Sequence, residues 1–139
     1  MPVGNRILRA VYDTNVLVSA LVFDGEVREL WNCVESGRVI LCLSRFIVDE
    51  FASVALRLGS PPGKTGLLVS AIMEHALVVV PTMTVDFIKT DISDNQVLAC
   101  ALESGADVIV TGNMKHIRPL GGFRGIPIET PAEFRRRLG

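Results

Sequence analysis

"RAVYDTNVLVSAL", residues 9–21, joins a short apolar run to a longer one through a single acidic residue. Residues 7–12 predict a buried strand, and the apolar residues that follow from Thr14 predict a helix. Asp13 stands between the two. An ionised carboxylate in such a place needs water, a partner or a cation, although aspartate also commonly caps the start of a helix. The role of Asp13 therefore depends on where the other acidic residues lie.

The same strand-then-helix order recurs along the rest of the chain. Further strands are expected in apolar runs at 39–44, 77–81, 106–111 and 126–129, the last of them at an edge of the sheet. Helices are expected at 14–23, 26–36, 45–58, 67–76, 95–104 and 131–138, and a loop at 59–66. Because continuous apolar strands alternate with helices, the sequence predicts a three-layer α/β/α sandwich with a central, mainly parallel sheet.

Local signals mark where several of these helices begin and end. Ser44 can cap the helix that follows it. Ser93 and Gln96 have the S-x-x-Q spacing of a capping box, which predicts that the next helix starts there. Gly37 and Gly105 each follow a helical stretch, in the position where glycine commonly ends a helix.

Length and composition indicate one ordinary globular domain over residues 1–139, with 49% apolar and 21% charged residues. The formal net charge of −1 means that any attraction for nucleic acid must come from a local basic patch. The odd number of cysteines, Cys33, Cys42 and Cys100, without a C-x-x-C pair, predicts reduced, packed thiols. We expect a cytoplasmic protein, because the N-terminus lacks a signal-peptide core and no apolar run approaches roughly 20 residues.

A second acidic residue, Glu50, falls in the apolar stripe of the helix predicted at 45–58. The stripe, at i, i+3, i+4 spacing, consists of Phe46, Ile47, Glu50, Phe51, Val54 and Leu58. The neighbouring Asp49 lies on the other side with Arg45 four residues before it, as in an ordinary solvent-exposed pair. A carboxylate on the core face is costly unless it is paired, protonated or bound to metal. A salt bridge to an arginine, or a position at the stripe edge that reaches water, would also explain Glu50.

Asp94 is less distinctive, because it falls in the first turn of a predicted helix, where the helix dipole favours an acid. Asp91, three residues earlier, is expected in the loop before it, where it could also assist the other acids. Asp107 opens a strand after a turn, and a structural role is expected for it.

In parallel α/β sheets, ligands bind beyond the carboxyl ends of the strands. Asp13 follows one strand there, and Asn113 stands at the matching place after the strand at 106–111. If Asp13, Glu50 and Asp94 converge, their charges repel strongly. Carboxylate oxygens suit hard divalent cations, so the three acids together predict a Mg²⁺ or Mn²⁺ site.

Several motifs match a known family. The stretches are VYDTNVLVSAL, SRFIVDEFASVA, DISDNQVLACALESGADVIVTGN and KHI, and together they span the chain from about residue 7 to about residue 130. They resemble the PIN-domain family, in particular the VapC-like toxin nucleases. The resemblance implies a PIN-like fold and metal-dependent cleavage of single-stranded RNA phosphodiesters. It places the family's first acid on Asp13, its helix glutamate on Glu50 and its third acid on Asp94, as catalytic residues and metal ligands.

The family's fourth acidic position falls on Asn113, which adds no charge. An amide oxygen can still bind Mg²⁺ or a metal-bound water, so Asn113 is predicted to be a catalytic residue. With three acids, one firm metal site is expected. In the family, the positions of Asn15 and Thr111 orient the acids by hydrogen bonding.

Substrate contacts are expected just after Asn113. Three basic residues lie there, Lys115, His116 and Arg118. They could neutralise phosphates beside the cleavage site, or they form a solvent-exposed turn. The arginine run at 135–137 is expected to be a solvent-exposed helix face.

The leading hypothesis is therefore a Mg²⁺- or Mn²⁺-dependent endoribonuclease, the toxin half of a toxin–antitoxin pair. It implies single-stranded RNA as substrate, and an antitoxin that inserts a segment into the acidic cleft. It also implies a homodimer that uses the helices around 26–35 and 64–75. The alternative, kept open by Asn113, is a catalytically weak PIN-like module that binds RNA or a protein. A metal-dependent phosphatase is a third possibility.

Overall fold

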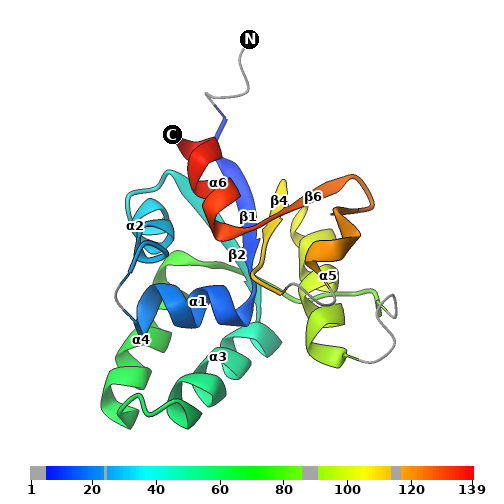
Figure 1. Cartoon of the computed structure of the whole chain (residues 1–139). Coiled ribbons are helices and arrows are strands. Elements are labelled where there is room, and N and C mark those ends of the chain that lie inside the picture. Colours follow the sequence, from blue (N-terminus) through cyan, green and yellow to red (C-terminus); the bar gives the residue numbers. More distant parts are fainter. Residues whose placement is uncertain (1–5, 24, 86–90, 114–116) are drawn as a thin grey trace.

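The computed structural model describes residues 6–23, 25–85, 91–113 and 117–139, and within them the chain folds around one mostly parallel sheet (Figure 1). The strand order is β3-β2-β1-β4-β6-β5, and β5 alone is antiparallel to its neighbour. The strands are β1 (Leu8–Tyr12), β2 (Val39–Ser44), β3 (Leu77–Val79), β4 (Val108–Val110), β5 (Gly122–Phe123) and β6 (Ile126–Glu129). The predicted α/β fold with a mainly parallel sheet is confirmed.

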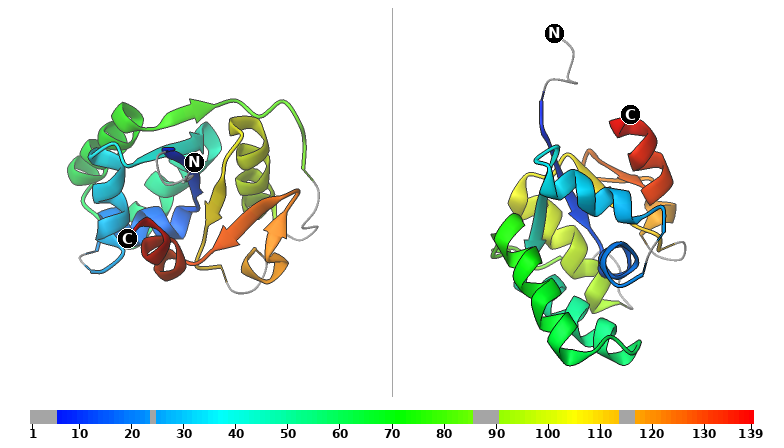
Figure 2. Two further views of the ribbon diagram at one scale, coloured as in Figure 1. Left: turned by 90° about the horizontal axis from the view of Figure 1, so that it is seen from above. Right: turned by 90° about the vertical axis from the view of Figure 1, so that its left-hand side faces the viewer.

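Helices cover both faces of this sheet. They are α1 (Thr14–Leu21), α2 (Arg28–Glu35), α3 (Arg45–Arg57), α4 (Pro62–His75), α5 (Ile92–Ser104) and α6 (Pro131–Leu138). Helix α5 packs against β1 and β2 on one face, whereas α1, α2 and α6 lie on the other (Figure 2). Helices α3 and α4 pack on each other and extend beyond the carboxyl ends of the strands (Figure 1).

The core lies where the central strands meet these helices. The last three residues of β1 are fully buried, as are all three residues of β4, because both strands are covered on both faces. Cys33, Cys42 and Cys100 are free thiols buried in this core, so their predicted packing is confirmed. Burial, and then the neighbouring Cys42, raises the pKa of Cys100 to about 12. Within the described residues, no helix combines the length and apolar character that crossing a bilayer requires.

The predicted loop at 59–66 is wrong, because α4 already begins at Pro62. Proline fits the first turn of a helix, where its missing N–H removes no hydrogen bond. The Thr65 hydroxyl lies 2.9 Å from both the Ser60 hydroxyl and the Pro61 carbonyl, which holds this turn together. These contacts outweigh the glycines that make the stretch resemble a loop.

Two other local predictions also need correction. Strand β6 is not at the edge, because it pairs with both β4 and β5, and the two-residue β5 takes the edge instead. Ser44 has the extended backbone of a cap residue, but its hydroxyl makes no capping hydrogen bond and is buried without a partner in the described part of the chain. Gly105 ends α5 in the left-handed conformation, as predicted.

Candidate active site

The carboxyl ends of β1 and β4 lie side by side, and a cavity opens beyond them. Tyr12 pairs with Val110, and the backbone N–H of Asp13 donates to the Val110 carbonyl at 3.1 Å. The cavity has a volume of about 230 Å³. We call it the acid pocket, and it is lined by Asp13, Thr14, Asn15, Glu50, Val54, Arg57, Asp91, Ser93, Asp94, Val97 and Asn113. The starts of α1 and α5 and one face of α3 therefore meet at the edge of the sheet where ligands bind in such folds.

Asp13 is both the cap of α1 and part of the pocket wall. Its Oδ1 accepts a hydrogen bond from the Val16 amide at 2.9 Å, and its Oδ2 accepts one from the Thr111 hydroxyl. Burial is the largest influence on its pKa and raises it above the ordinary value. The two hydrogen bonds act against this shift, whereas the negative charges of Asp94 and Glu50 add to it. The two interpretations offered by the sequence, cap and site residue, are thus compatible.

Glu50 joins the starts of two other helices. Its Oε1 accepts a hydrogen bond from the Thr14 hydroxyl at the start of α1, and its Oε2 accepts one from the Ser93 hydroxyl in α5. The expected alternative of an arginine salt bridge is not found, because no basic side chain of the described residues pairs with Glu50. Its side chain is partly exposed toward the pocket.

The predicted apolar stripe of α3 is partly wrong, and the error explains the position of Glu50. Phe46 is 37% exposed and Leu58 is 54% exposed, so neither belongs to the core. The buried residues of α3 are Ile47, Val48, Phe51 and Ala55. The core face is therefore rotated relative to the prediction, and Glu50 lies at its edge.

Asp94 lies in the first turn of α5 and is buried. Its Oδ1 accepts a hydrogen bond from the side-chain amide of Asn113 at 2.9 Å, and its backbone N–H donates to Asp91 Oδ1 at 3.1 Å. Asp91 is therefore the cap of α5, and the predicted capping box of Ser93 and Gln96 is wrong. The hydroxyl of Ser93 bonds Glu50 instead.

Asn113 is held in place by its own neighbour. Its backbone N–H donates to the Thr111 hydroxyl oxygen at 2.9 Å, and that hydroxyl in turn donates to Asp13. An ionised carboxylate at position 113 could not donate to Asp94, because it only accepts hydrogen bonds. The amide therefore has a function in this network that the family's usual acid would not have.

The remaining predicted residues are less closely tied to the acids. Asn15 lines the acid pocket with an exposed side chain, while the hydroxyls that bond Glu50 belong to Thr14 and Ser93. Neither was selected from the sequence, although Thr14 directly follows Asp13. Arg57 was missed as well; its spacing of seven residues from Glu50 was the available signal. The predicted substrate residues Lys115 and His116 lie outside the described residues.

The oxygen donors of the acid pocket fit a hard divalent cation. Each of the three acids accepts hydrogen bonds from neutral hydroxyls or amides, and carboxylate oxygens keep further lone pairs for a metal. In the described part of the chain, no group of three or more His, Cys, Asp or Glu side chains is already arranged to hold a metal ion. The fit to a metal therefore rests on the chemical type of the donors.

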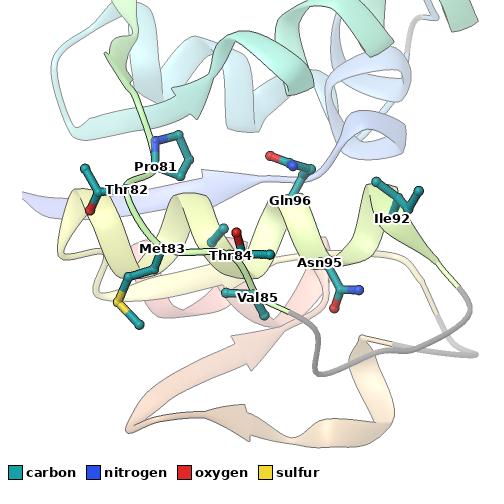
Figure 3. A pocket seen from close by; sticks show the side chains of 9 residues that line it. Pro81, Thr82, Met83, Thr84, Val85, Ile92, Asn95 and Gln96 are labelled. Atoms are coloured by element: carbon teal, nitrogen blue, oxygen red, sulfur yellow. The ribbon is translucent and has the colours of Figure 1, made fainter.

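A second cavity, of about 440 Å³, lies between residues 81–85 and α5 (Figure 3). It is lined by Pro81, Thr82, Met83, Thr84, Val85, Ile92, Asn95, Gln96 and Ala99. These side chains are apolar or neutral, so within the described residues this larger cavity has no group that transfers protons or binds a hard cation. We therefore take the acid pocket as the candidate active site, although it is the smaller of the two.

Comparison with known proteins identifies the family. A sequence model of the PIN domain matches residues 9–115, which include Asp13, Glu50, Asp94 and Asn113. This match covers most of the chain, so the chain belongs to the PIN domain family, as the sequence motifs predicted. No curated protein matches the sequence.

Solved structures agree on the fold. One match is a chain in the crystal structure of VapBC2 from Rickettsia felis bound to a DNA fragment from their promoter. The TM-score is 0.62 and the sequence identity is 13%, over 88% of this chain and 98% of that chain. At this identity the likeness establishes the fold alone.

Proposed function

We propose that this protein is a divalent-metal-dependent nuclease that cleaves single-stranded RNA. The observation that carries the proposal is the meeting of Asp13, Glu50 and Asp94 in one pocket, from three separate elements. The acids influence one another there, since the charges of Asp94 and Glu50 raise the pKa of Asp13. Carboxylates that gather in one pocket attract a cation, and membership of the PIN domain family supports nuclease chemistry.

The three acids would hold Mg²⁺ or Mn²⁺ through their carboxylate oxygens. When bound, such an ion stabilises charge on a phosphate and makes water a stronger nucleophile at neutral pH. The protein's own contribution is to fix the ligands. Thr111 orients Asp13, while Thr14 and Ser93 orient the two oxygens of Glu50. Hydrogen bonds of this kind keep metal ligands in a single geometry.

Asn113 fixes the third ligand. Its amide nitrogen donates to Asp94 Oδ1 and so fixes the orientation of that carboxylate. Because Asn113 brings an amide where the family usually has an acid, we propose one firmly bound ion, with any second ion arriving together with a substrate phosphate. In this role Asn113 positions Asp94 and does not act as an acid or base.

We further propose a protein antitoxin as partner. The similar fold in the Rickettsia felis VapBC2 complex supports this at the level of the fold. An antitoxin segment with a basic side chain would suit the acid pocket. A homodimer through α2 and α4 also stays a proposal, and the exposed Leu67 and Met73 of α4 supply apolar surface for it. A cytoplasmic location stays a prediction from the sequence.

The test is cleavage of a fluorescent single-stranded RNA with Mg²⁺, with Mn²⁺ and with EDTA. The wild type is compared with Glu50→Gln and with the matched control Asp49→Asn. Asp49 is the next residue on the same helix, but it is exposed and pairs with Arg45 at 3.0 Å. We expect cleavage that stops in EDTA, is lost in Glu50→Gln and continues in Asp49→Asn. Absence of metal-dependent cleavage by the wild type, or equal cleavage by Glu50→Gln, contradicts the proposal.

One alternative is a PIN-like module that binds RNA with weak catalysis. Asn113 favours it, because an amide that donates to Asp94 stands where the family usually has an acid. The same RNA separates the two functions. A binding module holds it in Mg²⁺ without cutting it, and its affinity does not depend on Glu50.

A further inference from the structure

Arg57 lies on the same face of α3 as Glu50. Seven residues separate them, which is close to two helical turns and about 10.5 Å along the helix axis. Both side chains line the acid pocket. Long side chains on a helix lean toward its N-terminus, so Arg57 leans toward the acids.

The charges of the pocket make Arg57 distinctive. Four of the residues that line it are acidic, namely Asp13, Glu50, Asp91 and Asp94. Among the described residues, Arg57 is the single basic residue in this lining. It is exposed, and the ion pairs found within the described residues do not join its guanidinium to any of these carboxylates. Arg45 at the start of the same helix, in contrast, is already paired with Asp49.

Building on the nuclease function proposed above, we propose that Arg57 binds a phosphate of the RNA strand next to the one that is cut. A guanidinium binds phosphate oxygens with two parallel hydrogen bonds, which fixes both the position and the direction of the strand. The acids attract a metal and the scissile phosphate, whereas Arg57, beyond ion-pair distance from them, holds the neighbouring phosphate. It is a positioning residue that sets how the strand enters the pocket.

This contact has a signature in salt dependence. Each phosphate that a protein neutralises on a single strand changes the slope of log Kobs against log salt by about 0.7. The measurement is fluorescence anisotropy with a labelled single-stranded oligoribonucleotide in EDTA, so that cleavage does not interfere. We expect Arg57→Ala to bind about tenfold more weakly at low salt, with a slope less steep by about 0.7.

Two further variants make the result specific. Arg45→Ala removes the same charge from the same helix outside the pocket, and we expect its slope to equal that of the wild type. Arg57→Lys keeps the charge without the two-bond geometry, so it should keep the slope and lose part of the affinity. In cleavage assays with Mg²⁺, Arg57→Ala should raise KM and leave kcat within about twofold.

The possible outcomes separate this inference from the proposed function. An unchanged slope in Arg57→Ala, an equal change in Arg45→Ala, or a fall in kcat at constant KM overturns the role of Arg57, even where the wild type cuts RNA. A wild type that binds RNA without cutting it contradicts the nuclease, while the slope still decides on Arg57. A wild type that does not bind RNA contradicts both.

Discussion

The carboxylates at the two ends of the sheet have different partners. Where β4 begins, Asp107 pairs with the guanidinium of Arg6, and its other oxygen accepts the backbone N–H of Arg9 at 2.8 Å. At the opposite end of the neighbouring strand, Asp13 accepts hydrogen bonds from a backbone amide and from the Thr111 hydroxyl. One acid is balanced by a positive charge, and the other by neutral donors.

The difference separates structural acids from functional ones. A paired carboxylate like Asp107 ties a strand start to its neighbour and has little need of a cation. Asp13 is buried, and other carboxylates stand close by, so its ionised form is costly and its pKa is raised. A bound cation would stabilise the ionised carboxylate and offset this cost. The end of the sheet with neutral donors is therefore the end that can bind a metal.

The largest effect is expected when one carboxylate is removed from each end of the sheet. We expect Asp13→Asn to lower the rate of RNA cleavage by at least about 10²-fold, because loss of a residue that merely orients a metal ligand already costs about 10–100-fold. Asp107→Asn should keep its rate within about threefold, because it lies at the far end of the strands. Rates are measured with the same RNA at saturating Mg²⁺.

Stability provides the control for this pair. Asp107→Asn loses its attraction to Arg6, and we expect its free energy of unfolding to fall by about 0.2–1 kcal/mol in urea titrations, because the Arg6 side chain is 60% exposed. Asp13→Asn should be at least as stable as the wild type in EDTA, since it removes a costly buried charge. If Asp107→Asn also abolishes cleavage while folded, the two ends are not functionally distinct.

Thr111 tests whether the neutral donors matter. Thr111→Val keeps the shape of a fully buried side chain but removes the hydroxyl that donates to Asp13 and accepts from Asn113. We expect the concentration of Mn²⁺ for half-maximal cleavage to rise about 10–100-fold. Thr82→Val is the matched control, because its hydroxyl bonds Glu103 away from the pocket. Equal Mn²⁺ requirements for the two variants contradict the role given to Thr111.

Much of the fold could be predicted because its signals are local. Apolar runs gave the order of strands and helices, and Gly105 marked the end of α5. Signals for helix starts failed where tertiary contacts compete. The Ser93 hydroxyl bonds Glu50, which lies 43 positions away, and Asp91 caps α5 in its place. The sequence does not reveal this competition, because no local signal distinguishes a serine that caps a helix from a serine that bonds a distant side chain.

The acidic residues of the candidate site could be predicted from the sequence, whereas the side chains that surround them could not. Asp13 and Glu50 were detectable because a charge interrupts an apolar pattern. Thr14 and Arg57 interrupt no pattern, and only the packing of α1 and α3 against each other brings them into the acid pocket. In the sequence, side chains that orient or assist a charged group look like any other polar residue. Their role therefore depends on three-dimensional neighbours.

Asn113 can be replaced by the acid that usually occupies this position in the family, which adds a charge to the acid pocket. Asn113→Asp places a carboxylate 2.9 Å from Asp94 in exchange for an amide donor. We expect the metal-free protein to lose about 1–2 kcal/mol of stability at neutral pH, and its affinity for Mn²⁺ to rise about tenfold. Melting temperatures with EDTA and with increasing Mn²⁺ measure both effects.

A surface position provides the matched control for that change. Asn32 also donates its amide to a carboxylate, Glu29, at 3.3 Å, but on the exposed face of α2. Asn32→Asp makes the same chemical change where water and salt screen the charges. It should change neither the metal-free stability nor the response to Mn²⁺ to the same extent. If Asn113→Asp behaves like Asn32→Asp, the two acids at positions 94 and 113 do not compete for one pocket.

The smallest effect is a slope of stability against pH, and it arises at the Asp13 end of the sheet. The pKa of Asp13 is raised in the folded protein, mainly by burial. Between its unfolded and folded pKa values the folded state therefore binds more protons, so the free energy of unfolding falls as pH rises through that window. Asp13→Asn lacks this contribution, and urea titrations in EDTA from about pH 4 to about pH 8 should give the wild type the steeper decline. Mg²⁺ should flatten the wild-type curve, because the cation stabilises the ionised carboxylate. Equal slopes for wild type and variant in EDTA would mean that the buried charge carries no cost, and the acid pocket would then have no electrostatic reason to bind a metal.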